Sequence, residues 1–196
     1  CPNWSEFADA SLNYFVETEK LNHAQLGQIA SLSSRVKLSV ALELEKQHNL
    51  RIDFKKLLTP SGAKKKIGDE VYANLSRLAT TFATTNYDDW LDKIPPEPLR
   101  ADEPAPPQSL SLGTSRQCFY KRNDISVENL DVPNAVFHIH GSIRDRETMV
   151  LRTVDYLDRY SSHRIDGKGN HENAFLTFLQ TLFQLKNVLF IGYGLN

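Results

Sequence analysis

The first 80 residues carry apolar side chains at intervals of three and four. This spacing places side chains on one face of an α-helix. The clearest set opens the chain and consists of Trp4, Phe7, Ala8, Leu12, Phe15 and Val16. Ser5 is a candidate N-cap for this helix. Similar spacing continues over residues 26–44 and, after the turn sequence at 60–62, over residues 70–78. The pattern predicts a mainly helical portion over residues 1–78.

From residue 79 onward, short β-prone runs alternate with helical patterns. Strands are expected near residues 79–85, 117–120, 135–139, 148–151 and 188–191, and helices near 88–91, 153–160 and 174–185. Six of the nine prolines fall between Pro95 and Pro107, so residues 93–115 are expected to form an extended surface loop. The alternation over residues 79–196 is typical of an α/β domain with a mainly parallel sheet.

Three of the expected strands end in distinctive groups. These are Thr84-Thr85-Asn86-Tyr87-Asp88, His138-Ile139-His140-Gly141-Ser142 and Gly192-Tyr193-Gly194. Ligands of open parallel sheets bind beyond the carboxyl ends of the strands, so the three groups would converge on one edge. Asn and Asp can bond sugar hydroxyls, His can move a proton, and Gly lets the backbone approach a phosphate. The combination suits a sugar-phosphate ligand.

Each of these residues also has an ordinary structural explanation when it is taken alone. An Asn at a strand end is commonly a turn or cap residue, and Gly192 and Gly194 are turn glycines in that explanation. The side chains of His138 and His140 point to the same face of a strand, a spacing that also occurs in metal sites. No Cys or Glu lies nearby at ligand spacing, so no metal is expected. The conjunction of the three groups carries the prediction.

Composition narrows the possible partners. Lys and Arg number 23 against 24 for Asp and Glu, a net charge of -1, which argues against a general nucleic-acid or membrane-surface binder. No apolar run approaches the ~18 residues of a spanning helix. The two cysteines, Cys1 and Cys118, cannot build a zinc site alone and indicate no disulfide framework. A cytoplasmic location is therefore expected.

Four segments, taken in order, resemble the signature of SIR2-like (sirtuin-like) domains, most closely the branch found in bacterial anti-phage defence proteins. They are residues 84–88, 137–142, 151–156 and 190–196. The opening residues 2–7 resemble the segment just after the family's glycine-rich loop, which cradles the NAD pyrophosphate; here the first glycine is Gly27. The resemblance implies a Rossmann-like sheet in a partial NAD-binding domain spanning residues 1–196. Its first strand and glycine loop would be missing, and further domains would lie beyond residue 196.

The resemblance implies a role for each matched residue. Asn86 would hold the nicotinamide ribose and a water, and His140 would be the general base. Asp88 would orient the ribose or the asparagine loop. Gly192 and Tyr193 would lie along the adenosine ribose and phosphate. The remaining residues expected to contact NAD+ are Thr84, Thr85, Gly141, Ser142 and Gly194.

The function implied by the resemblance is that of an NAD+ hydrolase that depletes NAD+ during phage infection. Such a protein would assemble as a homo-oligomer and respond to a phage-derived trigger sensed by other domains. A non-catalytic module that binds NAD or ADP-ribose is one alternative, although it does not need both Asn86 and His140. An NAD-dependent protein deacylase is another, but those enzymes carry a four-cysteine zinc module that Cys1 and Cys118 cannot supply. His138 has no role in the family and is expected to serve packing or to support the site.

Overall fold

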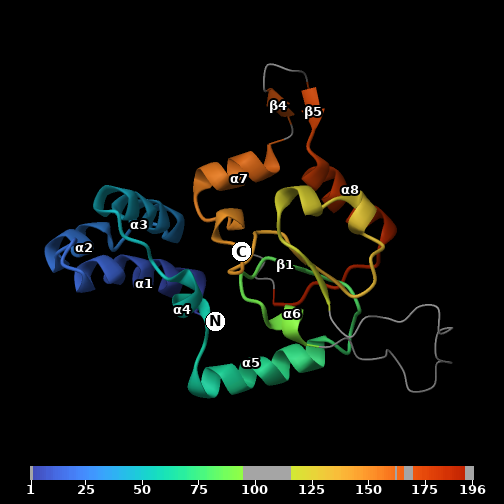
Figure 1. Cartoon of the computed structure of the whole chain (residues 1–196), viewed down its shortest axis with the longest axis horizontal. Coiled ribbons are helices and arrows are strands. Elements are labelled where there is room, and N and C mark those ends of the chain that lie inside the picture. Colours follow the sequence, from blue (N-terminus) through green and yellow to red (C-terminus); the bar gives the residue numbers. More distant parts are fainter. Residues whose placement is uncertain (1, 95–115, 162, 166–169, 193–196) are drawn as a thin grey trace.

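The computed structural model describes residues 2–94, 116–161, 163–165 and 170–192, with side chains left out over 163–172. Its N-terminal portion is helical: the first four helices gather beside the rest of the molecule, and the fifth runs below the α/β portion (Figure 1). These helices are α1 (Trp4–Glu17), α2 (His23–Ile29), α3 (Ser34–His48), α4 (Phe54–Leu58) and α5 (Gly62–Leu75). The predicted helical N-terminal portion is therefore confirmed.

The N-cap of helix α1 is Asn3, two residues earlier than the predicted cap, Ser5. The side-chain oxygen of Asn3 accepts a hydrogen bond from the Glu6 N–H (2.9 Å), and the Glu6 carboxylate accepts one from the Asn3 N–H (3.0 Å). This reciprocal pair satisfies two backbone donors that the helix itself leaves unpaired. Ser5 is therefore wrong as the N-cap, and it lies within the helix. The apolar face of α1, which includes Phe7 and Leu12, is buried as predicted.

A parallel three-stranded sheet forms the centre of the α/β portion. Its order is β1-β3-β2, and every pairing is parallel, so the predicted α/β fold with a Rossmann-like parallel sheet is confirmed. The strands are β1 (Phe82–Thr84), β2 (Gln117–Phe119) and β3 (Ala135–His138). Thr84 pairs with His138, so the segments that follow β1 and β3 leave the sheet at the same edge. This register brings the expected Asn and His groups together.

The remaining elements surround this sheet. The α-helices are α6 (Trp90–Lys93), α7 (Thr153–Tyr160) and α8 (Ala174–Leu185). Three single turns of 3-10 helix are η1 (Arg122–Asp124), η2 (Val127–Asn129) and η3 (Arg146–Thr148). A separate antiparallel pair is formed by β4 (His163–Ile165) and β5 (Asn170–Glu172).

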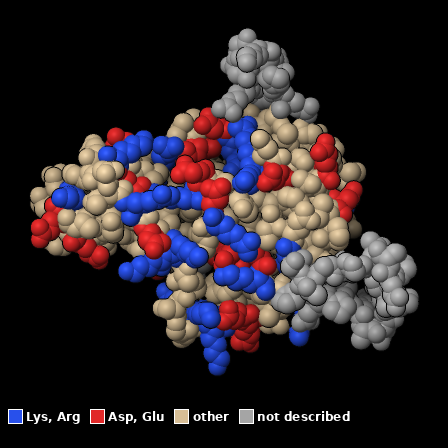
Figure 2. All heavy atoms as spheres, in the orientation of Figure 1, with Lys and Arg blue, Asp and Glu red and all other residues tan. Residues whose placement is uncertain are grey.

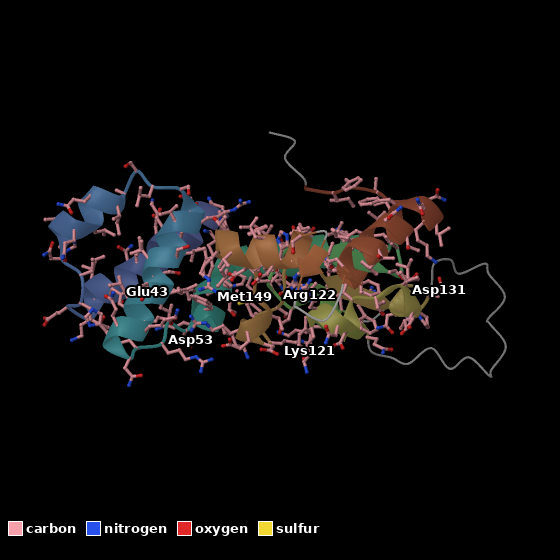
Figure 3. All side chains as sticks on the ribbon, turned by 90° about the horizontal axis from the view of Figure 1, so that it is seen from above. Glu43, Asp53, Lys121, Arg122, Asp131 and Met149 are labelled. Atoms are coloured by element: carbon pink, nitrogen blue, oxygen red, sulfur yellow. The ribbon has the colours of Figure 1, made fainter. Side chains whose placement is uncertain are left out.

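Two apolar clusters form the core. One packs β3 against α8 and includes Phe137, Phe175 and Phe178. The other fills the helical portion but also takes in Met149 and Tyr87 from the α/β portion. Figure 3 shows Met149 at the junction of the two portions. The helical and α/β portions are therefore joined by this second cluster.

Residues 188–191 do not form the expected strand. Their backbone is irregular, and their side chains expose 40%, 72%, 63% and 53% of their surface. An apolar run becomes a buried strand only where a sheet edge is available to pair with it, and among the described strands none pairs with this run. The strand expected near 148–151 is instead the end of η3 followed by irregular backbone. Of the expected loop at 93–115, Lys93 ends α6, and residues 95–115 lie outside the described residues.

On the face shown in Figure 2, basic and acidic side chains of the described residues are interspersed. Charge of one sign therefore does not gather over a broad area of that face. No helix among the described residues has the length and apolar character needed to cross a bilayer.

Candidate functional site

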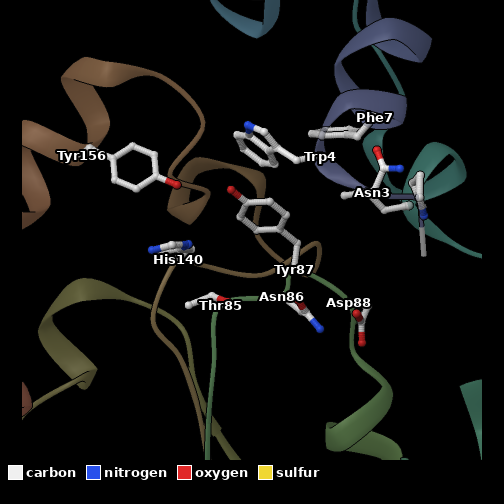
Figure 4. A pocket seen from close by; sticks show the side chains of 11 residues that line it. Asn3, Trp4, Phe7, Thr85, Asn86, Tyr87, Asp88, His140 and Tyr156 are labelled. Atoms are coloured by element: carbon white, nitrogen blue, oxygen red, sulfur yellow. The ribbon is translucent and has the colours of Figure 1, made fainter. Parts of the chain in front are cut away.

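A pocket of about 270 Å³ opens where β1 and β3 end. Its walls come from segments far apart in the chain, as Figure 4 shows. They are the start of the chain and α1 (Pro2, Asn3, Trp4 and Phe7), α4 (Leu58), the segment after β1 (Thr85, Asn86, Tyr87 and Asp88), the segment after β3 (His140) and α7 (Tyr156). The helical portion and the α/β portion thus enclose the pocket together.

Aromatic side chains make up much of the wall. The rings of Trp4 and Tyr87 are 5.9 Å apart, and Trp4 also contacts Phe7 at 6.1 Å between ring centroids. The Tyr87 hydroxyl donates a 2.6 Å hydrogen bond to the carbonyl of Val150, which fixes the ring against the segment before α7. Burial raises the pKa of Tyr87, so this side chain stays neutral. The wall offers flat apolar faces of the kind that pack against planar ligand groups.

Asn86 is held by contacts on three sides. Its N–H donates to the Thr84 hydroxyl (3.0 Å), and its side-chain amide donates to the Tyr72 hydroxyl on α5 (3.0 Å). Its carbonyl oxygen lies 3.3 Å from Nδ1 of His138. The Tyr72 hydroxyl in turn donates to a carboxylate oxygen of Asp88 (3.3 Å). Asn86 is exposed and lines the pocket, while contacts with residues outside the pocket lining position both its backbone and its side chain.

Helix α5 supports this arrangement through Trp90. The Tyr72 ring lies 4.9 Å from the Trp90 ring, and the indole N–H of Trp90 donates to Asp69 (2.8 Å). Gly68 faces the same indole, and a Cβ added there would lie 2.2 Å from it. Burial, and then the charge of Asp88, raises the pKa of Tyr72 to about 12. The hydroxyl that binds Asn86 therefore keeps its proton.

A buried acid and imidazole lie directly behind the pocket. Nε2 of His138 is 2.7 Å from a carboxylate oxygen of Asp92, and both side chains are fully buried. The other oxygen of Asp92 forms an ion pair with Nε of Arg144 at 3.0 Å. Burial by itself raises the pKa of Asp92, but the hydrogen bond to His138 and the charge of Arg144 outweigh it, so the pKa lies below its ordinary value. His138 thus links a buried carboxylate to the backbone of Asn86.

His140 lines the pocket itself, whereas His138 and Asp92 do not. Its Nε2 forms a 2.9 Å hydrogen bond with the Tyr160 hydroxyl, and its ring meets the Tyr156 ring edge-on at 5.2 Å. Burial, followed by the charges of Arg159 and Arg35, lowers the pKa of His140 to about 4. The imidazole is therefore neutral at pH 7 and able to accept a proton. Within the described part of the chain, no three His, Cys, Asp or Glu side chains are grouped so as to hold a metal ion.

The structure brings part of the predicted residue set to the pocket. Those that line it are Thr85, Asn86, Asp88 and His140. Asp88 is buried, and this burial raises its pKa against the opposing hydrogen bonds of the Trp90 N–H and the Tyr72 hydroxyl. The roles of these residues toward NAD+ stay predictions.

The other predicted residues lie elsewhere. Thr84 stands behind Asn86 and accepts its N–H. Gly141 has a φ of +85°, and a Cβ there would lie 2.1 Å from the Thr148 carbonyl oxygen, so a tight turn requires this glycine. Ser142 is fully buried, and Gly192 is exposed away from the pocket lining. Tyr193 and Gly194 lie outside the described residues.

Several pocket residues are absent from the predicted set. Trp4 and Tyr156 lie in segments that resemble the family. They could therefore have been predicted from the sequence, although the resemblance implies no role for them. Leu58 has no such signal, and neither does Tyr72, which does not line the pocket but binds Asn86; both reach the site only through the packing of α4 and α5.

Comparison with known proteins identifies the class. A family model described as a SIR2-like domain matches residues 80–196, well over half of the chain. The chain therefore belongs to the SIR2-like domain family, whose members use NAD+. The resemblance seen in the sequence is confirmed at this level, and the anti-phage defence branch stays a prediction. No curated protein and no solved structure matches the chain.

Proposed function

We propose that the protein is an NAD+ glycohydrolase, which cleaves the bond between nicotinamide and ribose and releases nicotinamide and ADP-ribose. The observation that carries the proposal is that Asn86 and His140, which come from different strands, line one pocket. Membership of a family that uses NAD+ supports the choice of substrate. The wider proposal is an anti-phage effector that depletes NAD+, works as a homo-oligomer and answers a phage-derived trigger.

The pocket suits one half of the dinucleotide. Its volume of about 270 Å³ lies near the lower end of the ~300–1,000 Å³ range of small-molecule sites, so it holds part of NAD+ and not the whole molecule. In the proposal, the nicotinamide ring packs against the faces of Trp4 and Tyr87. Asn86 and Asp88 then lie on the side where ribose hydroxyls need hydrogen-bond partners.

The proposed chemistry is hydrolysis at C1′ of the ribose. The C1′–N bond breaks, its electron pair leaves with nicotinamide, and positive charge develops on the sugar. The oxygen of a water held by Asn86 bonds to C1′, and the water proton passes to His140. We assign Nε2–H of His140 as the donor to the Tyr160 hydroxyl oxygen, which leaves Nδ1 of the neutral ring to accept the proton. Proton transfer of this kind typically contributes about 10²–10⁴-fold in rate.

A variant of the general base tests the proposal. In the intact protein, His140→Ala should slow NAD+ consumption by at least about 100-fold, while binding of ADP-ribose, measured by calorimetry, is retained. His48→Ala, at an exposed position of α3, is the matched control and should leave turnover unchanged. Normal NAD+ hydrolysis by His140→Ala would contradict the assignment. Binding without turnover in the wild type would favour a sensor module, and release of acyl groups from an acyl-lysine peptide would favour a deacylase.

A further inference from the structure

Arg35 is a cation at the edge of the pocket that the proposed chemistry does not use. It lies in the first turn of α3, in the helical portion, and its guanidinium carbon is 4.2 Å from the centroid of the Tyr156 ring. Tyr156 lines the pocket from the other portion of the molecule. Arg35 itself is exposed, so its guanidinium is open to a ligand from the solvent side.

The positive charge of Arg35 is not neutralised by a neighbouring acid. No carboxylate among the described residues forms an ion pair with it, and the nearest acid in sequence to Tyr156, Asp155, is bound by Arg152 at 2.7 Å. The charge nevertheless reaches the pocket, because it contributes to the lowered pKa of His140 after burial and Arg159. An exposed guanidinium without an acidic partner, stacked on an aromatic ring, is well prepared to bind an anion.

We propose that Arg35 binds a phosphate of the substrate where the pocket opens beside Tyr156. This inference rests on the proposed function and specifies its substrate class as nicotinamide nucleotides that carry phosphate, as opposed to the nucleoside. In the proposed function the nicotinamide nucleoside occupies the pocket, so we place the phosphate on the ribose C5′ outside it, on the side of Tyr156 and Arg35. A guanidinium can donate two parallel hydrogen bonds to phosphate oxygens, and stacking on Tyr156 already restricts its orientation.

The second arginine near His140 cannot take this role. Arg159 is 5% exposed, and its Nη2 donates to the carbonyl of Thr148 at 3.1 Å. Its guanidinium also lies over the Phe175 ring, which belongs to the core against α8. Arg159 therefore acts on His140 through its charge from within the protein, whereas Arg35 is accessible to a bound phosphate.

Comparison of two substrates tests the role of Arg35 in the intact protein. Arg35→Gln should raise KM for NAD+ about tenfold or more, the effect of losing a charge-assisted hydrogen bond, with kcat within about twofold. The same variant should leave KM for nicotinamide riboside, which has no phosphate, unchanged. Arg35→Lys keeps the charge but not the fork, so its KM should be intermediate. Arg51→Gln, an exposed arginine that does not line the pocket, is the control.

Equal effects of Arg35→Gln on both substrates would overturn the proposal, because they would indicate a purely structural contact with Tyr156. An unchanged KM for NAD+ would also overturn it. A second measurement separates this inference from the proposed hydrolysis. If the wild type does not turn over NAD+, the affinity for ADP-ribose is measured instead. An affinity about tenfold lower in Arg35→Gln than in Arg51→Gln would support the phosphate contact. Equal affinities, or no binding by the wild type, overturn it.

Discussion

At the scale of single residues, the candidate site depends on groups that never touch the pocket. Asn86 is exposed, but its carbonyl faces His138, which is buried and bonded to Asp92. Removing one member of a buried hydrogen-bonded pair leaves the other without its partner, and this costs more than the bond itself contributes. The pair therefore makes the backbone of Asn86 depend on the stability of the sheet behind it.

A matched pair of aspartate variants in one short segment measures this dependence. Asp92→Ala should lower the free energy of unfolding by about 1–3 kcal/mol, because it leaves the ring nitrogen of His138 buried without its hydrogen-bond partner. Asp89→Ala removes a surface pair with Lys93, in which the lysine is mostly exposed, and should cost at most about 1 kcal/mol. Urea titration monitored by circular dichroism gives both values. Similar losses of unfolding free energy in the two variants would show that the buried pair contributes no more to stability than the surface pair.

At the scale of elements, α5 acts as a brace for the end of β1. Tyr72 binds the Asn86 amide, and its ring rests on Trp90 at the start of α6. Gly68 permits this close approach, since it presents no side chain to the indole. The position of the helix is therefore set by an aromatic contact that leaves no room for a methyl group.

Two glycine variants in helices distinguish packing from helix propensity. Gly68→Ala should destabilise the protein by about 1–3 kcal/mol, since its Cβ would lie 2.2 Å from the Trp90 ring and α5 would have to shift. Gly27→Ala, in α2, meets nothing within 4 Å and should stabilise by about 0.5–1 kcal/mol. Thermal unfolding compares the two. A gain in stability for Gly68→Ala would mean that α5 does not rest tightly on Trp90.

The helices and strands also show which parts of the fold can be predicted from the sequence and which cannot. Helices α7 and α8 have the bounds that their apolar patterns predict, because a helix forms its backbone hydrogen bonds within its own segment. The run at 188–191 is equally apolar, but a strand must find an edge elsewhere, and local sequence carries no information about that edge. The meeting of Trp4 with Tyr87 is likewise a tertiary contact. Asn86 and His140 could be predicted because each directly follows a strand.

At the scale of the whole molecule, the helical and α/β portions behave as one packed body. Met149 is 5% exposed and belongs to the core cluster that is otherwise built mostly from α1, α3 and α4. Tyr87 crosses the same junction, and the pocket lies beside it. A shared core of this kind couples the unfolding of the two portions.

The two tryptophans allow this coupling to be measured. Trp4 lies in the helical portion and Trp90 in the α/β portion, so the fluorescence of each follows the unfolding of one portion. In the single-tryptophan variants Trp90→Phe and Trp4→Phe, the denaturant transition followed by fluorescence should coincide with the transition followed by circular dichroism. Met149→Ala should lower stability by about 2–5 kcal/mol in both backgrounds, whereas Leu157→Ala, 64% exposed, should change it by less than about 0.5 kcal/mol. Separate transitions for the two probes would refute a shared core.

The composition of the pocket wall also bears on how such a domain can pass between proteins. The family model matches residues 80–196, yet Trp4, Phe7 and Leu58 of the pocket wall lie before this match. A gene fusion that transferred only residues 80–196 would carry Asn86 and His140 without the helices that complete the wall of the pocket. Because those helices form part of the wall, the unit that must be transferred to keep the pocket intact is larger than the matched region.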